Sequence, residues 1–224
     1  TDNVTAPVVT GGAGGFNLLG NPYTSHINSA TFLTENSSNL VTQTIWVWNQ
    51  ANENYDAMVT DDAFVLAPAQ GFFVRANSDT NLNFIENNQA NNGGTFQKSS
   101  KTEVKLMMND GTNNRFAKLY YFDNATTGFD NGYDSSIFTG VPSGFAVYTR
   151  TVGTGEERNL GIQSLPNENY ENMVIPIGVN AAAESSLSFS VNASNFPTGI
   201  AVYLEDSLLN TYTTLENEAV YNTS

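Results

Sequence analysis

Cysteine is absent from the 224 residues, and this absence removes several kinds of chemistry. Disulfide cross-links, thiolate metal sites and a cysteine nucleophile all need that side chain, so the sequence excludes them. The chain also lacks any run of about 18 apolar residues, so we expect no membrane-spanning helix. It begins at Thr1 without methionine or a signal peptide. We therefore expect a processed product or an excised piece of a longer protein.

Basic residues are scarce: 8 lysines and arginines stand against 22 aspartates and glutamates, for a net charge of −14. Binding to DNA, RNA or an anionic membrane needs a basic surface, so we expect no nucleic-acid partner and no membrane insertion. The acidity is compatible with cation binding. Hydrophobic residues at 40% and aromatic residues at 12% can fill a core, which argues against intrinsic disorder.

Helical periodicity is nearly absent, and short runs rich in Val, Ile and aromatic residues recur between turn residues. Residues 45–48 (IWVW) and 70–75 (QGFFVR) have the composition of strands. Residues 109–111 (NDG) separate two further apolar runs and give the strongest hairpin signal in the chain. One short helical turn is expected at 25–33, with Ser29 as its N-cap. This pattern predicts an all-β protein built from antiparallel β-sandwich modules, with very little helix.

An Asn- and Gly-rich segment, 87–94, predicts a boundary between two modules in tandem. We expect residues 1–94 to form a first β-sandwich-like module. Residues 95–224 would form a second module that lacks its last strand.

Several segments, in a fixed order, resemble those of a known class of proteins. GFNLLGNPY at 15–23 is similar to its "N-L-x-G-N-P-Y" turn, and the aromatic strand 45–48 followed by APAQGFFV at 67–74 is similar to its "P-x-Q-G-F-F-V" segment. The remaining matches are the loop ATTGFDNGYD at 125–134 and the closing strands at 158–166, 176–179 and 202–206.

Together these segments resemble the C-terminal, non-catalytic region of secreted and surface proteins of the Bacteroidetes (Flavobacteria type). In those proteins the region lies immediately ahead of the sorting domain read by the type IX secretion system. The resemblance implies an extracellular location at the bacterial cell surface and a structural role in a large exported protein, such as an adhesin. It also implies two partners: neighbouring domains of the same parent chain, and the secretion machinery by way of the adjacent sorting domain.

One loop offers candidate calcium ligands, because five oxygen-bearing side chains lie close together in sequence. Calcium takes six to eight oxygen ligands and tolerates irregular loops. The spacing is not that of an EF-hand, and Asp and Asn also cap their own turns without any metal. Calcium binding and turn capping are thus alternatives for Asp123, Asn124, Asp130, Asn131 and Asp134.

A second candidate site is aromatic. Trp46 and Trp48 are two residues apart, so on a strand they share one face, and Tyr55 follows a short turn. Such a face could stack against a sugar ring, which makes a carbohydrate-binding module the alternative function. It could equally pack into the core, where the two indole N–H groups would need partners.

No catalytic constellation is visible. A glycosidase needs two carboxylates opposed across a cleft, about 5–10 Å apart, whereas Asp61-Asp62 and Glu156-Glu157 are adjacent pairs. His26 is the only histidine, and the nucleophile elbow G-x-S-x-G of a serine hydrolase is missing. We therefore expect no enzymatic activity and no required cofactor, with Ca²⁺ as the one candidate.

Overall fold

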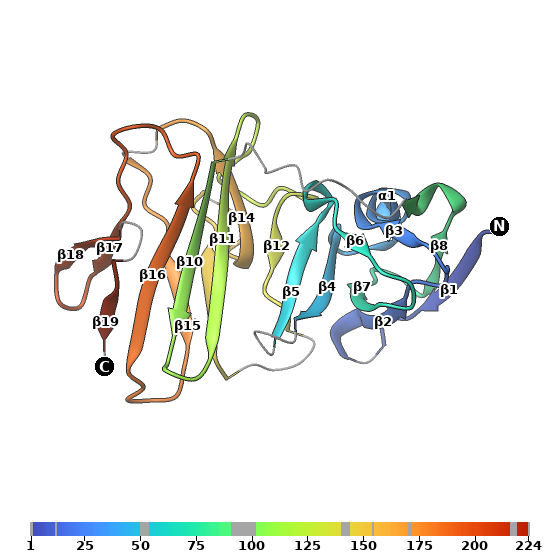
Figure 1. Ribbon diagram of the computed structural model, residues 1–224, viewed down its shortest axis with the longest axis horizontal. Helices are drawn as coiled ribbons and strands as arrows, with labels where there is room; N and C mark the ends of the chain where they lie inside the picture. Colours follow the sequence, from blue (N-terminus) through green and yellow to red (C-terminus); the bar gives the residue numbers. More distant parts are fainter. Residues whose placement is uncertain are drawn as a thin grey trace. The chain divides into compact units, whose positions relative to one another are not determined.

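The computed structural model describes residues 2–11, 13–49, 54–90, 102–139, 144–153, 155–169, 172–215 and 219–223. Within these residues strands dominate and there is one α-helix (Figure 1), which confirms the predicted all-β, sandwich-like class. The part of the chain that the structure describes contains no helix that is both long and apolar enough to cross a membrane.

The chain divides into two compact units. The first comprises Thr1–Lys98 together with Asn131–Val141, and the second comprises Ser99–Asp130 and Pro142–Ser224. The chain therefore leaves the second unit after Asp130 and returns to it at Pro142. The predicted boundary segment, 87–94, lies outside the described residues from residue 91 onward.

Apart from the two-residue β12, the described strands of the first unit form three sheets. Four strands pair in the order β2-β7-β4-β5, three in the order β6-β3-β9, and β1 pairs with β8. Short 3-10 turns lie between some of these strands. A two-residue strand, β12, lies in the segment Asn131–Val141, which also belongs to this unit. The bounds are β1 Val4–Val8, η1 Ala13–Gly15, β2 Phe16–Gly20, β3 His26–Asn28, α1 Ser29–Glu35, η2 Ser37–Asn39, β4 Thr44–Asn49, β5 Asn54–Val59, η3 Thr60–Asp62, β6 Val65–Leu66, β7 Gly71–Arg75, β8 Thr80–Phe84, η4 Glu86–Asn88, β9 Gln89–Ala90 and β12 Ser135–Ser136.

Helix α1 supplies the centre of the first core. Phe32 is fully buried, with its ring stacked at 4.8 Å on Phe84 and edge-on at 5.5 Å to Phe72. The N-cap is Asn28, whose side chain accepts a hydrogen bond from the backbone N–H of Ala30. The predicted cap, Ser29, is wrong by one residue, because Asn28 keeps the extended backbone of a cap while Ser29 is already helical.

The second unit is organised around one large sheet with the strand order β15-β13-β14-β11-β10-β16-β19. Leu106, Leu119, Leu165 and Val191 are among the buried residues of its core. Strands β17 and β18 pair separately as a hairpin. The bounds are β10 Thr102–Asn109, β11 Asn114–Phe122, β13 Ala146–Arg150, β14 Asn159–Pro166, β15 Ile177–Asn180, β16 Leu187–Ser194, β17 Tyr203–Asp206, β18 Thr211–Thr214 and β19 Tyr221–Thr223.

Strands β10 and β11 form the hairpin that the NDG turn predicted, with Asn109 opposite Asn114. Gly111 has φ +91°, a left-handed conformation that glycine adopts without strain. One pair departs from the antiparallel expectation: β11 and β14 run parallel. Parallel neighbours need a long crossover connection, and the residues between these two strands, which include β13, provide it.

Gly178 on β15 leaves room for a neighbouring ring. Tyr148 of β13 lies directly opposite and is buried, and a methyl group at position 178 would overlap its ring. Gly178→Ala is therefore expected to lower the free energy of unfolding by about 1–3 kcal/mol, the usual cost of overpacking. Calorimetric unfolding of the full chain measures this. Gly144→Ala is the matched control, because that glycine has open space around it, and an equal loss in both variants would contradict the prediction.

Candidate functional site

The four-stranded sheet of the first unit has two apolar faces. One face carries Val47, Phe72 and Val74 and is part of the core. On the opposite face Trp46 lies across from Phe73, and Trp48 lies across from Tyr55. This second face, here called the aromatic face, also carries Phe16 and Leu18 of β2, Leu18 being opposite Phe73.

The two tryptophans share this face but differ in exposure. Trp46 is 2% exposed, with Phe16 edge-on at 5.1 Å. Trp48 is 47% exposed, and its ring lies edge-on to Tyr55 at 5.1 Å. Of the three predicted sugar-stacking residues, Trp48 is exposed, Tyr55 beside it is half-buried, and the ring of Trp46 is covered.

Phe138 covers the ring of Trp46 and was not among the predicted site residues. Phe138 belongs to the segment Asn131–Val141 of the first unit. Its ring centroid lies 4.8–5.7 Å from those of Phe16, Trp46, Tyr55 and Phe73. The indole N–H of Trp46 is buried with no hydrogen-bond partner in the described part of the chain, so one expected indole partner is missing there.

The candidate calcium ligands divide between the units. Asp123, Asn124 and Asp130 belong to the second unit, and Asn131 and Asp134 to the first. Among the described residues no group of three or more His, Cys, Asp or Glu side chains is placed to hold a metal ion.

Two of the five side chains bind the chain itself. The Asp130 carboxylate accepts hydrogen bonds from the Thr126 N–H at 2.6 Å and from the Thr126 hydroxyl at 2.9 Å. The Asn131 side-chain oxygen accepts from the N–H of Gln43 at 2.9 Å. The bonds of Asp130 are those of a side chain that caps its own turn, whereas the bond of Asn131 joins two segments far apart in sequence.

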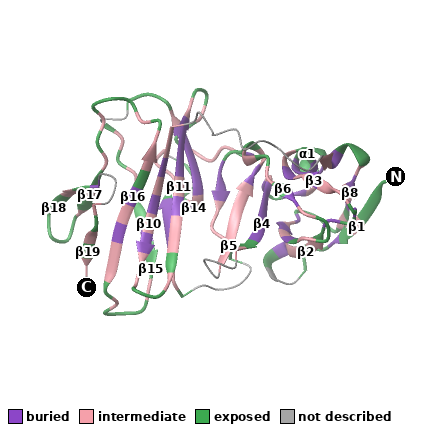
Figure 2. Ribbon diagram, viewed as in Figure 1, coloured by how far each residue is buried: buried purple, intermediate pink, exposed green. Residues whose placement is uncertain are grey.

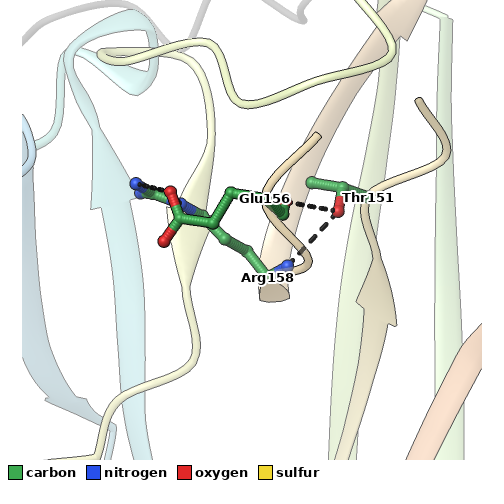
Figure 3. Close-up of polar contacts among 3 residues, drawn as sticks. All are labelled: Thr151, Glu156 and Arg158. Carbon is green, nitrogen blue, oxygen red and sulfur yellow. Dashed lines mark hydrogen bonds and ion pairs between the residues drawn. The ribbon is translucent and has the colours of Figure 1, made fainter. Parts of the chain in front are cut away.

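Arg158 organises the loop that follows β13. Thr151 donates its hydroxyl proton to the Glu156 carbonyl and accepts from the Arg158 N–H (Figure 3). The Arg158 side chain forms an ion pair with Glu156 at 2.7 Å and lies 4.1 Å from the centre of the Phe129 ring. Because Glu156 is exposed, the ion pair contributes little free energy, and this carboxylate serves the loop.

A polar cavity of about 430 Å³ lies in the second unit, lined by residues 109–111, 186–188 and 222–223. Its one ionisable lining residue is Asp110. Hydrogen bonds from the backbone and side chain of Asn113, and from the Thr112 N–H, lower the pKa of Asp110. That carboxylate is committed to its own turn, so this cavity does not present the opposed pair of carboxylates that a glycosidase uses.

Asp206 joins the β17–β18 hairpin to β19. Its carboxylate accepts from the Leu208 and Leu209 N–H groups and from the Tyr221 hydroxyl at 2.6 Å. The Tyr221 hydroxyl and the Leu209 and Leu208 amides lower the pKa of Asp206, and the bond to Asp206 raises the pKa of Tyr221.

These shifts predict a pH window for the hairpin. Stabilisation from Asp206 is present above about pH 4, the ordinary pKa of the group, and is lost as the pH falls through its lowered folded pKa. Stabilisation from Tyr221 is present below about pH 10 and is lost as the pH rises through its raised folded pKa. Hydrogen exchange of the Leu208 and Leu209 amides should therefore accelerate at both extremes beyond the intrinsic rate. If these two amides exchanged in Asp206→Asn with the same acceleration at low pH as in the wild type, this expectation would be contradicted.

The fold and these sites define an all-β protein of two units. Residues 60–224 match the family described as a domain of unknown function, DUF8693. The match covers well over half of the chain, so the chain belongs to this family. Comparison with the curated proteins and with the solved structures yields no match.

Proposed function

We propose that the chain is a non-catalytic structural and presenting module of a large exported cell-surface protein. The parent would be cargo of the type IX secretion system, with an adhesin as one form. Its partners would be neighbouring domains of the parent chain and, through an adjacent sorting domain, the secretion machinery.

The proposal is supported by the hydrogen bonds that residues form in the segments resembling the type IX secreted proteins. Asn21, of the GNPY segment, is buried, and its side chain donates to the carbonyls of Ser25 and Ala67 and accepts from the Tyr23 N–H. Gln70, of the QGFFV segment, accepts from the Ala67 N–H through its side chain and from the Asn21 N–H through its carbonyl. These hydrogen bonds hold the two segments together.

Side chains of a third such segment, residues 125–134, also form hydrogen bonds to the backbone. Asp130 and Asn131 of GFDNGYD cap their own turn and the Gln43 backbone. Residues that hold turns together in this manner serve a rigid scaffold, which supports a presenting role over a chemical one.

Turnover by the purified chain is the test. We expect no hydrolysis above the buffer rate on a panel of glycosides and peptides at pH 5–8. Hydrolysis that disappears on substitution of one carboxylate, such as Asp110→Asn, with the fold intact, would overturn the proposal.

A second candidate is glycan binding, favoured by the exposed Trp48, which lies edge-on to the half-buried Tyr55 on the face that also carries the exposed Leu18. An aromatic stacking contact contributes about 0.5–1.5 kcal/mol beyond the apolar area it buries. Trp48→Ala should therefore lower the affinity for any glycan that the wild-type chain binds by roughly tenfold or more. Tyr133→Ala is the control, as an exposed aromatic outside the aromatic face. Silence of the wild-type chain on a broad glycan array would remove the candidate.

Calcium at residues 123–134 remains part of this second proposal. An ion that binds only the folded chain raises the melting temperature by several degrees at a large excess over its Kd. The melting temperature in excess Ca²⁺, compared with EDTA, measures this. Asp130→Asn should abolish the shift, and an equal melting temperature in both buffers would end the idea.

A further inference from the structure

Large apolar side chains are concentrated at the surface of the β17–β18 hairpin. Leu208 and Leu209, in the turn, are 90% and 63% exposed, and Tyr203 and Tyr212 on the strands are also exposed. Figure 2 shows this turn in the exposed colour. Turns usually carry small polar residues, and neighbouring exposed apolar side chains mark interaction sites.

The hairpin is held in place from its other side. Leu204 and Leu215 pack into the core of the second unit, and the Leu215 N–H donates to the Val202 carbonyl at 2.8 Å. Asp206 accepts from the amides of both exposed leucines. A tip with a fixed backbone loses little conformational entropy when it binds.

The strands of the hairpin offer open edges. Each of β17 and β18 has one ladder partner, the other, within the described residues. The remaining edge of each strand carries backbone groups that an added extended segment could pair with. Two strands alone make a marginal sheet, and a third would stabilise it.

The charge around the hairpin identifies the chemistry of such a segment. Glu205 lies opposite Tyr212, whose hydroxyl donates to it at 3.1 Å. The second unit as a whole is acidic: residues 99–130 and 142–224 contain thirteen aspartates and glutamates and six lysines and arginines. This field attracts a cationic partner and repels anionic lipid or nucleic acid.

We propose that the β17–β18 hairpin is a docking element for an extended basic segment of a partner protein. The segment adds as a third strand, covers Leu208, Leu209 and Tyr212 with its apolar side chains, and sets Lys or Arg against Glu205. This site is separate from the aromatic face and does not depend on glycan binding.

Selection from a phage-displayed random peptide library on the full chain tests the proposal. Enriched peptides should alternate apolar residues with Lys or Arg, and their synthetic copies should bind Leu208→Ser/Leu209→Ser at least about tenfold more weakly than the wild-type chain. Binding should also weaken between 0.05 and 0.5 M salt, because exposed charge pairs are screened. Val174→Ser, which changes a valine that is 70% exposed elsewhere in the second unit, should bind like the wild type.

Both substituted leucines are exposed, so the melting temperature of the double variant should stay close to that of the wild type. Enrichment of acidic or neutral peptides, peptides that bind the double variant as tightly as the wild type, or no enrichment would overturn the proposal. Co-sedimentation with phosphatidylcholine vesicles that the double variant loses would instead make the hairpin a membrane contact, and would also overturn it.

Discussion

Replacing Phe32 with alanine is expected to lower the free energy of unfolding of the first unit by about 3–5 kcal/mol. The ring is fully buried between Phe72 and Phe84, so the change removes buried apolar area and leaves a cavity that a β-sheet core closes only in part. Both tryptophans of the chain lie in this unit. Denaturant unfolding followed by tryptophan fluorescence therefore reports on it directly.

Thr34→Ala is the matched control, since Thr34 lies on the exposed side of the same helix. It should change the free energy of unfolding by less than about 0.5 kcal/mol. A loss below about 1 kcal/mol for Phe32→Ala would mean that the core of this unit does not depend on α1.

Asn36 should be the most sensitive polar position. It is fully buried at the end of α1, and its side-chain amide donates to the carbonyls of Phe32 and Asn83, each at 2.9 Å. Its oxygen accepts from the Asn83 N–H at 2.7 Å, so one side chain joins the helix end to β8. Asn36→Ala leaves both backbone groups of Asn83 without this partner. An unsatisfied buried group costs about 1–3 kcal/mol. Both bonds to Asn83 are only part-buried, so we expect a total loss in the lower part of the range for two groups, about 2–4 kcal/mol, in the same unfolding experiment.

Asn81→Ala controls for the loss of an asparagine, because Asn81 is exposed on the same strand. It should be nearly neutral. Equal effects of the two substitutions would show that the buried bonds of Asn36 are not what stabilises this junction.

Local pattern was enough to predict the fold class. The NDG turn between two apolar runs specified the β10–β11 hairpin, because that turn chemistry depends on a few adjacent residues. The period of two along residues 45–48 likewise placed Trp46 and Trp48 on one face. The parallel pairing of β11 with β14 was not predictable in this way, because it depends on where a distant strand returns.

The exposure and hydrogen-bond partners of the candidate site residues depend in part on residues far along the chain. Trp46 is buried because Phe138, more than ninety residues later, packs against it, and the residues next to Phe138 do not indicate that distant partner. The capping alternative for Asp130 and Asn131 was visible from their residue types, whereas the actual partners, Thr126 and Gln43, are known only from the structure. The candidate residues could be named from the sequence, but their exposure depends on long-range packing.

Immunolabelling of intact producing cells, with antibodies raised against the purified chain, tests the proposed role most directly. An exported presenting module should label unpermeabilised cells as strongly as permeabilised ones, and the surface label should disappear when the type IX translocon is deleted. Label that appears only after permeabilisation, or that persists at the surface without that translocon, would contradict the proposed role.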